Sequence, residues 1–301
     1  MPLWIPITIA AAFLQNLRSA LQRQLARDLT ATSATYVRFL FGLPIALLYV
    51  AVLFVSFDTE LPTPPTAFYI YAAVGGIAQI LGTVLLVTLF TFRNFVVGTT
   101  YSKTETVLTA IFGIFILGET VGVEAGVGIF VSLMGVMAIS VARTELTPGT
   151  LLTSFISRTA LMGMGSGAAF GIAAVCYRAG SLSLEMEGAL LPAALTLAVV
   201  LTIQTVLMSV WLILRDRPSL IAALRNWPAS LAIGVTGALG SIGWFTAMTL
   251  ENAAYVRALG QIELVFTFAV SWIWFRERAN GREITGALLI IAGLVVLVLG
   301  A

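Results

Sequence analysis

The chain has 301 residues, of which 59% are hydrophobic and 10% are charged, and its mean hydropathy is +1.01. This composition lies outside the range of soluble globular proteins and predicts a membrane protein. The single cysteine excludes an intrachain disulfide, and the absence of histidine removes the usual zinc ligand and proton shuttle, so any proton coupling must use carboxylates. The formal charge of +2 is too small to indicate binding of nucleic acid.

Apolar runs of about 20 residues, the length that crosses a bilayer as a helix, predict an all-α integral membrane protein with ten transmembrane helices. We expect these spans near residues 3–26, 31–57, 67–91, 95–117, 123–142, 159–177, 188–213, 229–249, 254–275 and 283–300. The connections between them are short, so the sequence predicts no soluble domain.

An internal repeat relates the two halves of the chain at a shift of 158 residues without a gap. The superposed identical pairs include Gly76 and Gly234, Gly82 and Gly240, Glu105 and Glu263, Glu119 and Glu277, Gly128 and Gly286, and Gly135 and Gly293. Shared hydrophobic composition can imitate a repeat, but matched glutamates inside apolar runs are hard to obtain that way. We therefore predict two domains, a five-helix repeat over 1–145 and a second one over 146–301.

Five is an odd number of spans, so the second repeat must enter the membrane from the side opposite to the first. This arrangement is an inverted repeat. It is typical of secondary transporters, which place a substrate site near the middle of the membrane and open it alternately to each side.

Three segments of the chain resemble the drug/metabolite transporter superfamily in its ten-helix, EamA-type form. The resemblance rests on YVRFLFGLPIALL (36–48), which is similar to the family's arginine-led second helix. It rests also on two copies of a fourth-helix ending, TETVLTAIFGIFILGETVGVEAGVGIFVSLMGV (104–136) and IELVFTFAVSWIWFRERANGREITGALLIIAGL (262–294). The resemblance implies a multi-pass transporter, expected in a bacterial inner membrane, and it implies little about the substrate.

The first span contains an unusually polar stretch, QNLRSALQRQ (15–24). Gln15 and Arg18 share one stripe of the helix, and Asn16 lies on a neighbouring stripe. A polar face this wide is not expected to contact lipid, so we predict that Gln15, Asn16 and Arg18 line a substrate cavity. The alternative is that the helix ends early and these side chains meet water at the headgroups.

Lys103 and Glu105 lie at the start of an apolar run that is long enough to cross the bilayer. They are about 200° apart on a helix, so they cannot pair with each other and each needs its own partner. Glu105 and its repeat counterpart Glu263 are candidates for proton coupling or charge pairing. The competing interpretation is that both carboxylates form structural ion pairs with Arg18, Arg38 or Lys103. Arg38 is likewise a candidate for either role.

The remaining candidates for substrate binding are neutral. Gln79 and Gln261 offer amide groups, and Gln261 is the repeat counterpart of Lys103. Tyr101, Trp244 and Tyr255 lie at ends of spans that are expected to line the cavity, although aromatic residues at such positions are more often interfacial anchors.

The basic residues are distributed unequally between the two sides. Connections after the first, third, fifth, seventh and ninth spans contain Arg23, Arg27, Arg93, Arg143, Arg158, Arg215, Arg217, Arg225, Arg276, Arg278 and Arg282. The other side has Arg178 and Arg257. The positive-inside rule then places both termini outside the cytoplasm, whereas ten-helix members of the superfamily usually keep both inside.

These observations lead to one principal functional hypothesis. We expect a secondary transporter, not an enzyme, that moves a small polar or zwitterionic metabolite by alternating access. Lys103 and Arg18 would receive an anionic group, and a glutamate would receive a cationic group or a proton. Without a nucleotide-binding motif, a proton gradient or substrate exchange must supply the energy. The expected partners are a small molecule and the lipid bilayer, with no cofactor, no metal and a monomer as the functional form.

Two alternatives stay open at this stage. The first is proton-coupled efflux of organic cations, which the nearby cations Lys103 and Arg18 disfavour because they would repel such a substrate. The second is a membrane scaffold or accessory subunit, whose intramembrane charges only pair with one another.

Overall fold

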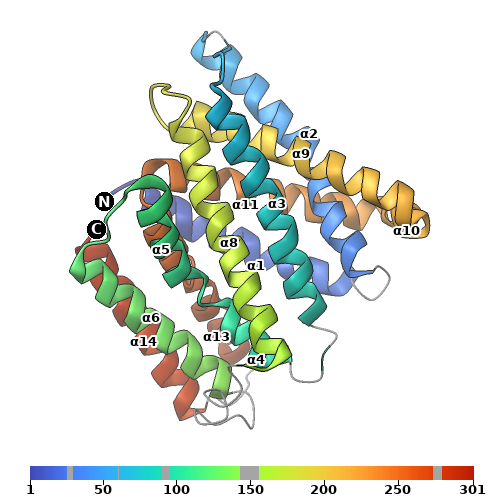
Figure 1. Ribbon diagram of the computed structural model, residues 1–301. Helices are drawn as coiled ribbons and strands as arrows, with labels where there is room; N and C mark the ends of the chain where they lie inside the picture. The colour runs from blue at the N-terminus through green and yellow to red at the C-terminus, as the bar shows by residue number, and fades with distance from the viewer. Residues whose placement is uncertain (26–29, 60, 90–91, 93–94, 143–155, 274–279) are drawn as a thin grey trace. The chain divides into compact units, whose positions relative to one another are not determined.

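The computed structural model describes residues 1–25, 30–59, 61–89, 92, 95–142, 156–273 and 280–301. Every regular element in these ranges is a helix (Figure 1). Seven of the described helices are long and apolar enough to cross a membrane. The prediction of an all-α membrane protein is therefore confirmed at the level of a multi-pass helical protein.

The helices begin and end close to the predicted limits of the spans. The long ones are α1 (Trp4–Leu25), α2 (Ala31–Phe57), α3 (Thr66–Leu89), α6 (Val123–Ala142), α8 (Arg158–Leu182), α9 (Leu190–Arg215), α11 (Trp227–Leu250) and α14 (Gly281–Leu299). The shorter ones are α4 (Phe95–Ser102), α5 (Glu105–Leu117), α10 (Arg217–Arg225), α12 (Ala253–Leu259) and α13 (Ile262–Ile273). Helix α10 was not predicted, because it fills one of the short polar connections.

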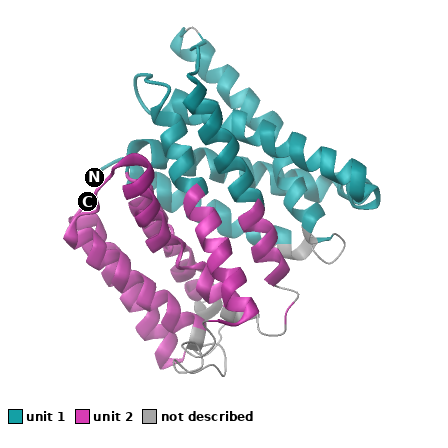
Figure 2. Ribbon diagram, in the orientation of Figure 1, with its two compact units in different colours: residues 1–80, 173–251 teal, residues 81–172, 252–301 magenta. Residues whose placement is uncertain are grey.

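The chain forms two compact units, each built from both halves of the sequence (Figure 2). Unit 1 consists of residues 1–80 and 173–251, and unit 2 consists of residues 81–172 and 252–301. The two units group residues that are in contact with one another, whereas the predicted boundary at 145/146 separates two halves that are similar in sequence. The division into two repeats therefore stays a prediction.

In unit 1, α2 packs against α9 and α11, and α1 packs along α11. The hydroxyls of Tyr36 on α2 and Ser209 on α9 are 2.8 Å apart and form a hydrogen bond between the two helices. Close contact between α2 and α11 requires a glycine, because a Cβ at Gly234 would collide with the Phe41 backbone and side chain. The same region holds buried apolar side chains such as Phe39 and Leu197.

The carboxyl end of α11 is held by Arg178, which lies on α8 within unit 1. Its Nη1 donates hydrogen bonds to the carbonyl oxygens of Met248 at 2.7 Å, Thr249 at 3.3 Å and Glu251 at 2.7 Å. The last carbonyls of a helix have no partner inside the helix, and the helix dipole favours a cation there. Arg178 therefore caps α11 from a neighbouring helix.

Replacing Arg178 by glutamine is expected to lower the free energy of unfolding by about 1 to 3 kcal/mol, because charged hydrogen bonds to partly buried carbonyls are lost. Arg217→Gln is a matched control, since Arg217 also donates to a carbonyl near a helix end, that of Ile213, but is exposed. Thermal unfolding of the purified proteins in detergent measures both effects. Equal losses in the two variants would contradict the capping role of Arg178.

Helices α6 and α14 form the closest helix pair of unit 2, and they lie side by side in Figure 1. A Cβ at Gly128 would lie 2.6 Å from the Gly293 carbonyl oxygen, and one at Gly135 would lie 2.6 Å from the Gly286 carbonyl oxygen. Small residues let helix backbones approach this closely in membranes. Because residue numbers rise along α6 where they fall along α14, the two helices are antiparallel.

Two of the predicted spans are interrupted, and both lie in unit 2. The run over 95–117 forms α4 and α5 with a break at Lys103 and Thr104, and the run over 254–275 forms α12 and α13 with a break at Gly260 and Gln261. The prediction of one continuous helix for each run was wrong. At the shift of 158 residues the two breaks overlap, since Lys103 corresponds to Gln261.

The breaks have a local cause in backbone hydrogen bonding. The amide of Lys103 donates to the Thr100 carbonyl at 3.1 Å, and the amide of Gln261 donates to the Ala258 carbonyl at 3.0 Å. Both bonds reach back three residues instead of four, as in a tight 3₁₀ turn. The Thr104 hydroxyl also donates to the Tyr101 carbonyl at 2.7 Å, which competes with the helical pattern.

Candidate functional site

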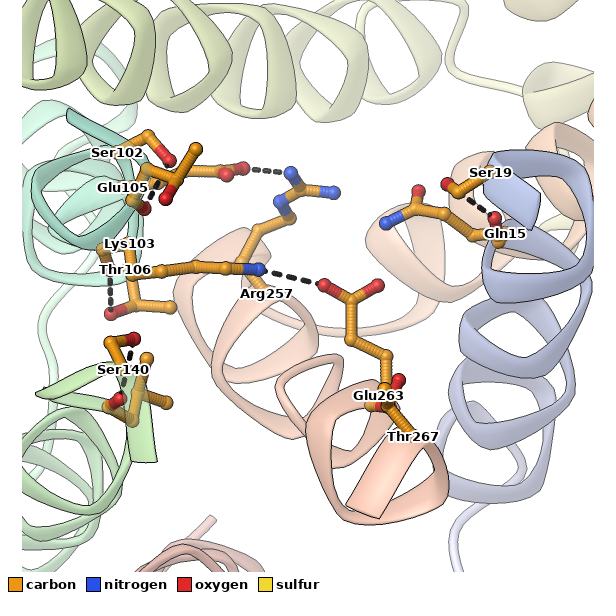
Figure 3. Close-up of polar contacts among 12 residues, drawn as sticks. Gln15, Ser19, Ser102, Lys103, Glu105, Thr106, Ser140, Arg257, Glu263 and Thr267 are labelled. Carbon is orange, nitrogen blue, oxygen red and sulfur yellow. Dashed lines mark hydrogen bonds and ion pairs between the residues drawn. The ribbon is translucent and has the colours of Figure 1, made fainter. Parts of the chain in front are cut away.

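Two ion pairs join the interrupted helices of unit 2 (Figure 3). The Nζ atom of Lys103 lies 2.7 Å from Oε1 of Glu263, and the guanidinium of Arg257 binds the carboxylate of Glu105. Each pair takes one residue from the first half of the sequence and one from the second half. We call these four residues the charge cluster.

The charge cluster is largely withdrawn from solvent. The side chain of Glu105 is 9% exposed, those of Glu263 and Arg257 are each 17% exposed, and that of Lys103 is 25% exposed. Ionised groups away from water are costly unless they are paired and hydrogen-bonded. Their formal charges add to zero, so the cluster satisfies its own charges.

The two carboxylates occupy equivalent local positions. Glu105 is the first residue of α5 and Glu263 is the second residue of α13, so both lie in the first turn of a half-helix. The positive end of the helix dipole stabilises a carboxylate there. The hydroxyls of Thr109 and Thr267, one turn later, donate to the carbonyl oxygens of Glu105 at 2.7 Å and Glu263 at 2.9 Å.

The sequence predicted part of this arrangement. Lys103 and Glu105 have separate partners, as expected, and Lys103 was one of the cations proposed to pair with a glutamate. Arg257 was not among the candidates, because it was counted as a charge at the membrane surface. The comparison of the halves places Arg257 opposite Thr99, on the stripe that corresponds to the stripe of Lys103, but it gave no ion-pair partner for it.

The other candidates in unit 2 are buried near the breaks. Gln261 is 6% exposed, and its Oε1 has no hydrogen-bond partner among the described residues. The hydroxyl of Tyr255 accepts a hydrogen bond from the backbone amide of Gly122 at 3.1 Å, which ties α12 to the connection between α5 and α6. Tyr101 packs against Ala160, with Met137 and Met164 alongside.

Unit 1 contains a small pocket that includes four of the predicted site residues. Its lining consists of Gln15, Arg18, Arg38, Thr236, Gly237, Gly240, Ser241 and Trp244. Helices α1, α2 and α11 supply these side chains. We call this site the arginine pocket. Asn16 lies on α1 and is not among the lining residues.

Gln79 is placed differently from the other candidates of unit 1. The amide nitrogen of Gln204, on α9, donates to Oε1 of Gln79 at 2.8 Å and to the Gly76 carbonyl at 3.1 Å. Gln204 is fully buried. The amide of Gln79 therefore takes part in a contact between α3 and α9. Whether it also contacts a substrate stays a prediction.

A multi-pass helical protein with an internally neutralised charge cluster on two interrupted helices has the features of a membrane transporter. The model of the EamA-like transporter family matches residues 2–141 and 157–299. The chain therefore belongs to this family, which makes it a transporter and not an enzyme.

Two curated relatives match part of the chain. They are the pseudopaline exporters CntI from two strains of Pseudomonas aeruginosa, and each is 33% identical over 76 residues. The aligned segment covers 25% of this chain and 27% of each exporter. The match therefore spans only about a quarter of these relatives.

A solved crystal structure of another protein resembles the whole chain, with a TM-score of 0.73 at 15% sequence identity. The superposition covers 98% of this chain and 97% of the other. At this identity the likeness shows the fold alone.

Proposed function

We propose that the protein is a secondary transporter that moves a small polar or zwitterionic metabolite by alternating access. The charge cluster is the observation that carries this proposal. Both of its ion pairs lie at helix breaks, where backbone polar groups are less constrained than in a continuous span. A zwitterion brings one charge of each sign, so its cationic group can pair with a glutamate of the cluster while its binding leaves the net charge of the protein unchanged.

We further propose that the chain consists of two inverted repeats, 1–145 and 146–301. The contacts between α6 and α14 support this proposal. The repeat relates Gly128 to Gly286 and Gly135 to Gly293, whereas the close contacts join Gly128 to Gly293 and Gly135 to Gly286. Contacts that exchange in this way are those of a two-fold axis. An axis that relates two antiparallel membrane helices lies in the plane of the membrane.

The same proposal includes ten spans in a bacterial inner membrane. Seven helices qualify as spans by length and composition. The remaining three would be α1, whose polar stretch weakens its hydropathy, and the interrupted pairs α4–α5 and α12–α13, in which neither helix alone is long enough. The two separate ranges matched by the family model also support two repeats.

Replacement of either glutamate tests the proposed site. Glu105→Gln and Glu263→Gln are each expected to reduce transport by about tenfold or more, which corresponds to about 1.4 kcal/mol. The assay uses proteoliposomes loaded with a mixture of amino acids, organic cations and phosphorylated metabolites, with efflux followed by mass spectrometry. Glu187→Gln, an exposed residue outside the cluster, is the control.

The outcomes separate the competing functions. Full transport by both properly inserted variants would exclude the charge cluster as the site. Transport of organic cations alone would favour drug efflux. A wild-type protein that neither transports nor is thermally stabilised by any compound of the mixture would favour the scaffold.

A further inference from the structure

The arginine pocket contains two cationic side chains, Arg18 and Arg38, and both lie against Gly237 of α11. The Cδ atom of Arg18 and the Cγ atom of Arg38 each lie 3.3 Å from the place where a Cβ of residue 237 would be. That position is occupied by a glycine on α11. The side chains of Arg18 and Arg38 therefore pass close to the same point of the α11 backbone, and a Cβ there would require them to move by a few tenths of an ångström.

The polar groups of the lining are mainly hydrogen-bond donors. A guanidinium and an indole N–H can donate but cannot accept, which applies to Arg18, Arg38 and Trp244. Gln15 and Ser241 can do both. The hydroxyl of Thr236 already donates to the Ala232 carbonyl at 2.7 Å. The lining residues include no carboxylate.

The guanidinium of Arg38 is buried in part without a hydrogen-bond acceptor among the described residues. Its Nε atom is buried and has no hydrogen-bond partner among the described residues. Its guanidinium carbon lies 5.4 Å from the centre of the Phe39 ring, a contact that holds the group without using its N–H donors. A buried donor that bonds to nothing is costly, and an acceptor placed in the pocket would remove that cost.

We propose that the arginine pocket is a subsite for the carboxylate group of the transported substrate. Guanidinium is planar and matches a carboxylate with two parallel hydrogen bonds, which a lysine cannot reproduce. The inference rests on the proposed function, because a substrate subsite presupposes transport. It narrows the substrate class to metabolites with a carboxylate and excludes simple organic cations.

Matched compounds test this subsite directly. Thermal unfolding of the purified protein is followed with L-lysine, L-phenylalanine and L-arginine, each beside its decarboxylated amine, cadaverine, phenethylamine or agmatine. At least one amino acid is expected to raise the melting temperature of the wild-type protein while its amine does not. Inorganic phosphate tests whether the pocket accepts any anion. Stabilisation by phosphate or by the amines, but by no carboxylate, would overturn the proposal.

Variants then assign the effect to the pocket. Arg38→Gln, Arg38→Lys and Gly237→Ala are each expected to reduce the ligand-induced shift by more than half, and Arg225→Gln, an exposed arginine of α10, should keep it. A purely structural Arg38 would instead lower the melting temperature of the unliganded protein and leave the ligand-induced shift intact, which would overturn the proposal. If Arg38→Gln does not fold, the ligand-induced shifts of Arg38→Lys and Gly237→Ala still test whether the ligand binds in the arginine pocket.

Transport assays distinguish a failure of this inference from a failure of the proposed function. If the protein in proteoliposomes transports the amines as well as the matching amino acids, the proposed transporter function holds and the carboxylate subsite is contradicted. Absence of both binding and transport for every compound would contradict the proposed function itself.

Discussion

Replacing Arg257 by glutamine is expected to lower the free energy of unfolding by about 3 to 5 kcal/mol, the usual cost of leaving one member of a buried ion pair without its partner. The residue left behind is Glu105, whose side chain is 9% exposed. Few intramembrane substitutions should cost more. Chemical or thermal unfolding in detergent measures the loss.

The second ion pair provides an internal comparison. Lys103→Gln is expected to cost less, because Lys103 is 25% exposed and its partner Glu263 is 17% exposed, so water can partly solvate the carboxylate. Exchange of the two charges in Lys103→Glu with Glu263→Lys should recover most of the stability lost by either single change. Similar losses for Arg257→Gln and Lys103→Gln, or a double exchange no better than the singles, would contradict the pairing.

The second large effect is expected at the contact between α6 and α14. Gly128→Val and Gly135→Val place side-chain atoms where the backbone of α14 lies, 2.6 Å from a Cβ. Overpacking usually costs about 1 to 3 kcal/mol, and more where only backbone can yield. We expect little folded protein from the double variant, as measured by the monodisperse yield in size-exclusion chromatography.

Gly113→Ala is the matched control for these substitutions. Gly113 lies within α5 of the same unit, and a Cβ there would meet nothing within 4 Å. Alanine is the better helix former by about 0.5 to 1 kcal/mol, so this variant should fold at least as well as the wild type. Normal yield from Gly128→Val and Gly135→Val would show that the two helices can separate without loss.

The limits of the helices were predictable because their signal is continuous apolar sequence. The prediction over 31–57 and the observed α2, Ala31–Phe57, illustrate this. The helix breaks were not predicted, because hydropathy averaged over a whole span does not register a change from four-residue to three-residue hydrogen bonding, even where Lys103 lies in the polar stretch TTYSKTET (99–106). Short α10 was missed because polar connections carry no hydrophobic period long enough to detect.

The candidate site was predictable only in part, and for a physical reason. The repeat marked Glu105 and Glu263, since both halves keep a glutamate at one position. Ion pairing between residues 160 positions apart depends on how helices pack, which spacing along one helix cannot reveal. Arg257 shows the limit most clearly, because nothing local distinguishes a paired intramembrane arginine from one that reaches the headgroups. Glu277, the counterpart of Glu119, lies outside the described residues.

The neutrality of the charge cluster has a consequence for energetics across the membrane. One elementary charge moved through a potential of 100 mV exchanges about 2.3 kcal/mol of electrical work. Two cations and two carboxylates that move together exchange none, so displacement of the cluster as a whole is insensitive to voltage. The sign of any current that accompanies turnover then reports the net charge of the substrate together with any coupled ion.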